Sequence, residues 1–156
     1  MQAARELFTT RGHARVTMSD IARMAGTAST ETLEKLRDAT SLESAVALVA
    51  RGTRADHERS QPMVDLLYSS MAGDDGARET WQHVLTGCRQ ALRDAAELIV
   101  GKGFIAPHFH VENVADRLWF CFGLNAWRTL IVDCQWACDD AERTLNHQAT
   151  SMLTES

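Results

Sequence analysis

The sequence has few of the residues that break helices and no pattern that builds a sheet. It contains two prolines and one tyrosine in 156 residues, and it has no run of alternating β-branched residues. Alanine, leucine, arginine and glutamate dominate instead, and these residues favour helix at almost every position. Because 45% of the residues are hydrophobic, the chain has ample material for a core. We therefore expect an all-α fold.

A long uninterrupted hydrophobic run is also missing. The longest apolar stretch, Leu118 to Val132, contains Asn125 and Arg128, so it is too short and too polar to span a bilayer. The first residues, MQAARELF, are typical of an amphipathic helix and not of a signal peptide. We therefore expect a cytoplasmic protein with no membrane partner, in which the four cysteines are free thiols. These are Cys88, Cys121, Cys134 and Cys138.

The sequence lacks the excess of positive charge that is typical of proteins coated with nucleic acid. The net charge is −5. Residues 1–33 nevertheless carry four arginines against three acidic residues, a balance of +1, so the rest of the chain carries −6. A mildly basic N-terminal segment on an acidic body permits local contact with phosphates and discourages indiscriminate binding.

Catalytic motifs are absent as well. We find no glycine-rich phosphate loop, no nucleophile elbow and no pair of carboxylates. His108 and His110 alternate in a loop without further ligands at zinc spacing, so they favour solvent-exposed histidines over a metal site. Cys134 and Cys138 are four residues apart and could form a redox pair, although ordinary thiols fit better. We expect neither an enzyme, a metal nor a cofactor.

The stretch TMSDIARMAGTASTETL, residues 17–33, is typical of two short helices joined by a tight turn. Thr17 and Asp20 form a capping-box start, and Gly26 can end the first helix in a left-handed conformation. Ser29 can then cap the second helix. An apolar stripe lies on the first helix at Ile21, Met24 and Ala25. The pattern predicts a helix-turn-helix whose second helix enters a DNA major groove, or equally a helical hairpin that only packs.

Apolar periodicity predicts five further helices. Gln61–Pro62 indicates a break between the first two, and Gly101 and Gly103 close the third. The predicted helices span residues 42–59, 63–72, 77–100, 111–132 and 139–153.

One family shares this pattern. The segment over residues 3–26 resembles the N-terminal signature of the tetracycline-repressor (TetR) family of bacterial regulators; it reads AARELFTTRGHARVTMSDIARMAG. HVENVADRLWFCFGLNAWRTLIVDCQW, residues 110–136, resembles that family's penultimate helix. The resemblance implies a repressor that binds operator DNA as a homodimer and is released by a small-molecule effector. It also implies that residues 1–33 bind DNA, and that residues 34–156 bind the effector and dimerise.

The resemblance stops inside the second helix. The family continues with a tyrosine, a phenylalanine and a lysine that opens a long fourth helix, whereas TETL runs here directly into EKLRDATSLESA. The comparison implies that some tens of residues are missing near Leu33–Glu34. Either a mobile segment is absent from this sequence, or the chain carries a true deletion.

The helix-turn-helix suggests which residues contact DNA. Thr17 lies at a helix start, where its hydroxyl and nearby N–H groups suit a phosphate, although it could equally be a cap alone. Small hydroxyl and methyl groups at the start of the second helix suit close approach to base edges. The predicted DNA contacts are Thr17, Ala28, Ser29, Thr30 and Thr32.

Two further sites follow for the body. Aromatic walls with a few polar groups suit a small, mostly apolar effector, although aromatic stripes more often belong to a core. The predicted effector residues are Tyr68, Trp81, Cys88, Trp119, Phe122 and Asn125. Because the helix over 111–132 is apolar on every side, a partner subunit is expected to cover it. The predicted dimer residues are Phe120, Leu124, Trp127, Ile131, Leu145, Ala149 and Met152.

The missing residues leave an alternative function open. An all-α protein that binds a small molecule, without competent DNA binding, fits the same body.

Overall fold

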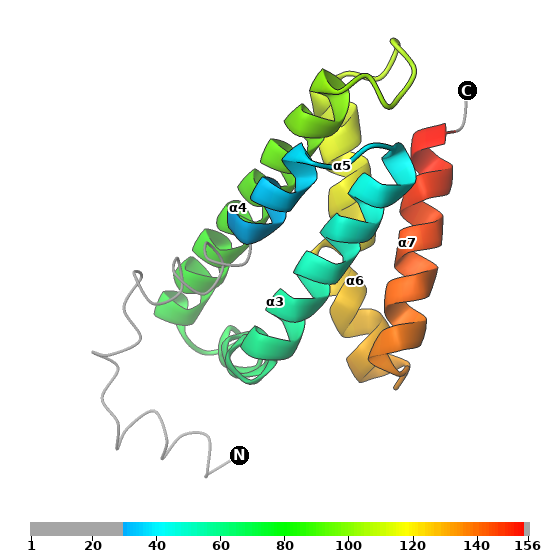
Figure 1. Ribbon diagram of the computed structural model, residues 1–156. Coiled ribbons are helices and arrows are strands. Elements are labelled where there is room, and N and C mark those ends of the chain that lie inside the picture. The colour runs from blue at the N-terminus through cyan, green and yellow to red at the C-terminus, as the bar shows by residue number, and fades with distance from the viewer. Residues whose placement is uncertain (1–29, 155–156) are drawn as a thin grey trace.

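The computed structural model describes residues 30–154, which form a helical body without strands (Figure 1). The all-α prediction is confirmed for these residues. A helix over residues 30–37 comes first. It is followed by α3 (Leu42–Ser70), α4 (Asp75–Gly101), α5 (Val111–Phe122), α6 (Leu124–Arg128), a π-helical turn (Thr129–Asp133) and α7 (Cys138–Thr154). The helices predicted before residue 30 lie outside the described part. Within it, no helix combines the length and the apolar character needed to cross a membrane.

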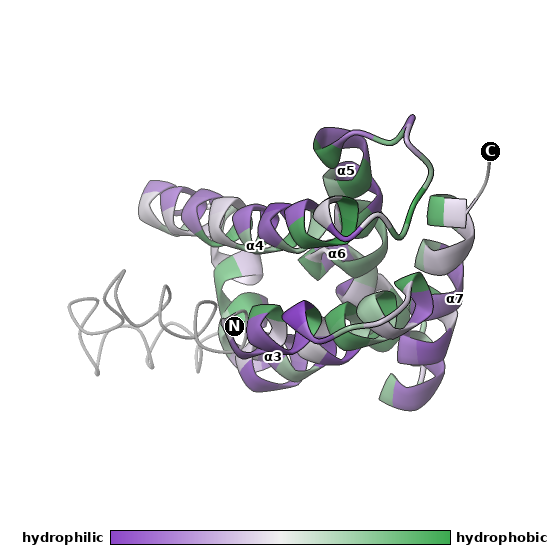
Figure 2. Ribbon diagram, turned by 45° about the horizontal axis from the view of Figure 1, so that its top comes forward, coloured by the Kyte–Doolittle hydropathy of each residue, from purple (hydrophilic) through white to green (hydrophobic). Residues whose placement is uncertain are grey.

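The helices pack around one main core. Helix α4 lies against α3 and α5, and α7 lies against α3 and α5. The apolar sides of α3 and α7 turn inward while polar residues cover their outer sides (Figure 2). The largest fully buried side chains of this core are Trp127, Leu36, Ile99, Leu118 and Leu153.

The helix starts follow the polar residues that the sequence places there. Ser41 caps α3 in a reciprocal box: its hydroxyl accepts from the backbone N–H of Ser44 at 3.2 Å, and its own N–H donates to the Ser44 hydroxyl at 3.1 Å. Asp74 caps α4 by accepting from the N–H of Gly76 at 2.8 Å and of Ala77 at 3.2 Å. The predicted end of α4 at residues 101–103 is confirmed, with Gly103 at φ +70°.

The predicted break at Gln61–Pro62 is wrong, because α3 continues through Pro62 to Ser70. Proline removes one backbone donor, so the carbonyl of Glu58 loses its usual partner. Glu58 and Pro62 are both exposed, so that carbonyl can be solvated. Buried His57 and Val64 lie on either side of the proline along the helix. Their packing outweighs the local preference for a break.

The single helix predicted over 111–132 is also wrong, because it is interrupted at Gly123. The backbone there is extended, with ψ 160°, and its N–H donates to the Trp119 carbonyl at 2.8 Å. An added Cβ at Gly123 would lie 2.6 Å from that carbonyl oxygen, so glycine is required for this close approach. The change of direction carries α6 toward α3, and Arg128 of α6 pairs with Asp65 at 3.0 Å.

The helix over residues 30–37 is tied to the body at both ends. Leu36 is completely buried, and the Lys102 ammonium donates to the carbonyls of Arg37 at 2.6 Å and Ala39 at 3.1 Å. At the other end, Thr32 packs against Gly52 of α3. This helix runs without interruption through Leu33–Glu34.

Candidate effector pocket

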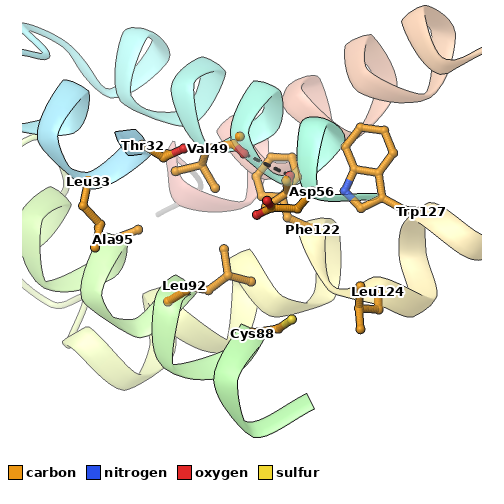
Figure 3. A pocket seen from close by; sticks show the side chains of 13 residues that line it. Thr32, Leu33, Val49, Asp56, Cys88, Leu92, Ala95, Phe122, Leu124 and Trp127 are labelled. Carbon is orange, nitrogen blue, oxygen red and sulfur yellow. Dashed lines mark hydrogen bonds between the residues drawn. The ribbon is translucent and has the colours of Figure 1, made fainter. Parts of the chain in front are cut away.

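A mostly apolar pocket lies between the helix over 30–37, α3, α4 and the α5–α6 corner (Figure 3). We call it the effector pocket because it is the candidate site for the effector expected from the sequence. Its cavity volume is about 60 Å³, which exceeds the space that one water molecule needs by several-fold. The polar side chains in its wall are Thr32, Thr53, Asp56 and Cys88. The larger apolar ones are Leu33, Val49, Leu92, Phe122, Leu124 and Trp127.

Asp56 is the only acidic or basic residue among those that line the effector pocket. Its Oδ1 is buried and accepts no hydrogen bond from the described residues. Arg59 lies 3.6 Å from this oxygen, too far for a hydrogen bond, and its own side chain is 47% exposed, so solvent screens the pair. Burial raises the pKa of Asp56 to about 6, and Arg59 opposes this only in part.

The raised pKa has a consequence for stability. At 1.36 kcal/mol per pH unit, the ionised carboxyl destabilises the fold by up to about 3 kcal/mol. The penalty is absent below pH 3.8, grows as the pH rises to about 6, and is constant above. A charge kept at such a penalty in a pocket is characteristic of a functional group.

The remaining polar groups of the wall offer no competing charge. The Thr53 hydroxyl donates to the carbonyl of Val49 at 2.9 Å, with Ala50 at 3.1 Å, so its proton is already committed. Burial, reinforced by the Asp56 carboxylate, raises the pKa of Cys88 to about 11, and its thiol therefore stays neutral at physiological pH.

Trp127 supplies a donor without an acceptor. Its indole is 1% exposed, and its Nε1 donates no hydrogen bond within the described part of the chain. One face of the indole stacks on His57, with ring centroids 5.9 Å apart. Burial lowers the pKa of His57, so this imidazole is neutral near pH 7. The nitrogen-bearing edge of Trp127 lies toward Asp56 and Phe122 (Figure 3).

Two of the six predicted effector residues, Cys88 and Phe122, line this pocket. Trp81 lies in a second core cluster between α3 and α4, and Tyr68 is 44% exposed with its ring nearly perpendicular to that of Trp81. Trp119 and Asn125 line a separate, wider groove of about 690 Å³ formed mainly by α5, α6 and α7. The aromatic residues are therefore divided among three places.

Sequence reasoning missed Asp56 as a pocket residue, although a signal for it exists. Four residues of α3 that line the pocket are spaced i, i+3, i+4 and i+7, so they share one face of the helix. They are Val49, Gly52, Thr53 and Asp56. A carboxylate that continues an apolar stripe is the pattern to look for.

The seven predicted dimer residues are divided between surface and core. Phe120 is 69% exposed and is the most exposed of the large hydrophobic side chains in the described part. Ile131 and Met152 are partly buried. The other four are buried within the subunit: Leu124, Trp127, Leu145 and Ala149.

Only part of the predicted DNA surface can be placed. Thr17, Ala28 and Ser29 lie outside the described residues. Thr30 is exposed at the start of the first described helix. Thr32 is half-buried against Gly52 and lines the effector pocket.

No group of three metal-ligating side chains occurs within residues 30–154. His108 and His110 are exposed on either side of the buried Phe109. All four cysteines are free: Cys121 is buried, Cys134 is exposed, and Cys88 and Cys138 are partly buried.

Comparison with known proteins gives a family match at the N-terminal end. No curated protein and no solved structure is significantly similar to the chain. Residues 1–30 match the family described as bacterial regulatory proteins, tetR family, which supports a DNA-binding transcriptional regulator.

Proposed function

We propose that the protein is a homodimeric TetR-type repressor, released from its operator DNA when a small effector enters the pocket. The observation that carries this proposal is the tetR-family match of residues 1–30, directly before a helix that lines a pocket. In this proposal Thr17, Ala28, Ser29 and Thr30 contact DNA. Thr32 belongs to the effector pocket because of its position against α3.

The position of the pocket explains how effector binding changes the affinity for DNA. Thr32 and Leu33 form part of its wall, and the helix that carries them continues the matched segment. A ligand that is larger than the cavity displaces this wall, and with it the attachment of residues 1–29. The effector then favours one of two arrangements of the DNA-binding segments.

Electrophoretic mobility shift with the DNA upstream of the protein's own gene tests the proposal. We expect a complex that survives physiological salt and excess unrelated DNA. Thr17→Ala should weaken this complex by about tenfold, as expected for a lost phosphate contact or helix cap.

Thr86→Ala is the matched control, because Thr86 is exposed on α4 and its hydroxyl only donates to the Gln82 carbonyl of the same helix. It should leave DNA affinity unchanged. If upstream DNA binds no better than unrelated DNA, the regulator proposal is wrong. An all-α protein that binds a small molecule would then be the better reading of the pocket.

The dimer interface is proposed on the outer face of α5 to α7. Phe120 projects there beside a groove that includes Trp119, Leu130 and Leu145. A large exposed aromatic side chain next to further apolar surface is typical of a protein interface. With Leu124 and Trp127 inside the subunit, the proposed contact centres on Phe120.

Phe120→Asp should convert the protein to a monomer, because a carboxylate cannot be buried unpaired at the centre of an interface. Sedimentation equilibrium measures the change, and circular dichroism should show unaltered helix content. Thr86→Asp adds the same charge on exposed α4 and should leave the dimer intact. A Phe120→Asp protein that stays dimeric would place the interface elsewhere.

A further inference from the structure

We propose that the effector pocket selects a compact organic cation, an apolar body carrying one protonated amine that pairs with Asp56. The inference deepens the proposed function by naming a ligand class for the same site. It depends on that function only for the biological role of the ligand, since binding itself requires no DNA.

The first argument is that a buried carboxylate oxygen of the pocket lacks a hydrogen-bond donor within the described residues. The Asp56 side chain lines the pocket, and its buried Oδ1 has no hydrogen-bond donor within the described residues. The 3.6 Å contact with exposed Arg59 leaves this position open. An ammonium group would supply both the missing hydrogen bond and the compensating charge.

The second argument is that no positively charged side chain lines the pocket to attract an anion. Asp56 would repel a carboxylate or phosphate. The thiol of Cys88 is neutral, and the Thr53 proton is committed to backbone carbonyls. The indole N–H of Trp127 can donate to one acceptor atom of the ligand, such as an ether or hydroxyl oxygen.

The third argument concerns the body of the ligand. Phe122 and Trp127 place two aromatic side chains in the same wall as Asp56 (Figure 3), and aromatic faces attract cations. Because the cavity is only about 60 Å³, the ligand is a compact molecule, and it enters by moving the helix over 30–37 outward. The ligand therefore combines one positive charge with a small apolar group.

Two series of probes of equal shape and different charge test this inference. They are n-butylamine, n-butanol and butyrate, and benzylamine, benzyl alcohol and benzoate. We expect the amines to raise the melting temperature of the full chain at pH 7.5 and to give heats of binding by titration calorimetry. The alcohols should bind at least about tenfold more weakly, and the acids not at all.

Asp56→Asn provides the decisive variant. It keeps the shape of the side chain and removes the charge, so the affinity for the better amine should fall by at least about tenfold. Because the native carboxyl destabilises the free protein at pH 7.5, this variant is expected to fold. Glu43→Gln removes an exposed charge from the first turn of the same helix and should bind amines normally.

Amine affinity should also fall as the pH drops below about 6, because protonated Asp56 no longer attracts the cation. Arg59 on α3 and Cys88 on α4 also interact with Asp56, and the Cys88 thiol stays neutral in this range because its pKa is raised to about 11. His57 on α3 stacks on Trp127, which lies in the same wall, and burial lowers the pKa of His57 below the ordinary value of 6.5, which favours its neutral form. Asp56→Asn should abolish this pH dependence.

Several results would overturn the inference: alcohols or acids that bind as well as amines, amines that do not bind, or an Asp56→Asn protein that binds amines normally. Amine binding without a DNA complex would instead retain this inference and reject the repressor.

Discussion

Replacing Trp127 with alanine should lower the free energy of unfolding by about 3–5 kcal/mol, as expected for truncation of a buried tryptophan. The indole is 1% exposed, stacks on His57, and closes one wall of the effector pocket, so its loss leaves a large cavity between α3 and α6. Urea denaturation followed by far-ultraviolet circular dichroism measures the change. The protein concentration must be held constant because the proposed dimerisation would affect apparent stability.

Two variants separate packing from the unpartnered indole nitrogen. Trp127→Phe keeps most of the packing and removes the buried donor, so it should lose less than about 1.5 kcal/mol. Trp136→Ala removes an indole that is 42% exposed and should change stability by less than about 1 kcal/mol. If all three variants were equally stable, Trp127 would not be part of the core.

Local chemistry made much of the body predictable from the sequence. Asp74 and the glycines at 101 and 103 bound α4 within two residues of the predicted ends, because caps act within one helical turn. The predicted helix over 42–59 buries its apolar stripe of Ala45, Val46, Val49 and Ala50, since a strong 3.6-residue period leaves one face for the core.

The errors arise where tertiary contacts outweigh local preference. Pro62 breaks helices in isolation, but core packing on both sides of it holds α3 together. Gly123 lies inside a strongly helical pattern, yet its close approach to the Trp119 carbonyl ends α5. The residues around Pro62 do not predict an unbroken helix, and glycine at 123 permits an interruption without requiring one.

The interruption at Gly123 also explains why the periodicity of the sequence does not show which residues line the pocket. A straight helix over 111–132 would be apolar all round and would need a partner to cover it. The bend lets Leu124 and Trp127 turn into their own subunit and reach the pocket, while Phe120 stays on the surface. The direction of such a bend depends on the packing of α3 and α4, which periodicity does not encode.

The second large effect is expected at Gly52, where the helix over 30–37 touches α3. A Cβ at this position would lie 2.2 Å from Thr32 Oγ1 and 3.0 Å from Thr32 Cγ2. The Thr32 Cβ would itself lie 3.1 Å away, so a change of χ1 cannot remove the overlap, and the helix that carries Thr32 must move outward. Gly52→Ala should therefore destabilise the protein by about 1–3 kcal/mol, although alanine favours helix by about 1 kcal/mol. Urea denaturation measures this change.

The same displacement should imitate a bound effector and weaken the proposed DNA complex by about tenfold in the mobility-shift experiment. The double variant Gly52→Ala/Thr32→Ala removes the two closest contacts, and of the three nearest atoms the Cβ of residue 32 remains, 3.1 Å away. This double variant should therefore restore most of the stability and most of the DNA binding. Gly87→Ala is the control, since a Cβ there meets nothing within 4 Å and should stabilise α4 slightly.

If Gly52→Ala lowers the stability no more than Gly87→Ala does, the helix that carries Thr32 moves away from α3 at little energetic cost. A ligand that displaces this helix would then have little effect on residues 1–29. If the double variant regains stability but not DNA binding, the contact holds the body together without controlling the DNA-binding segment.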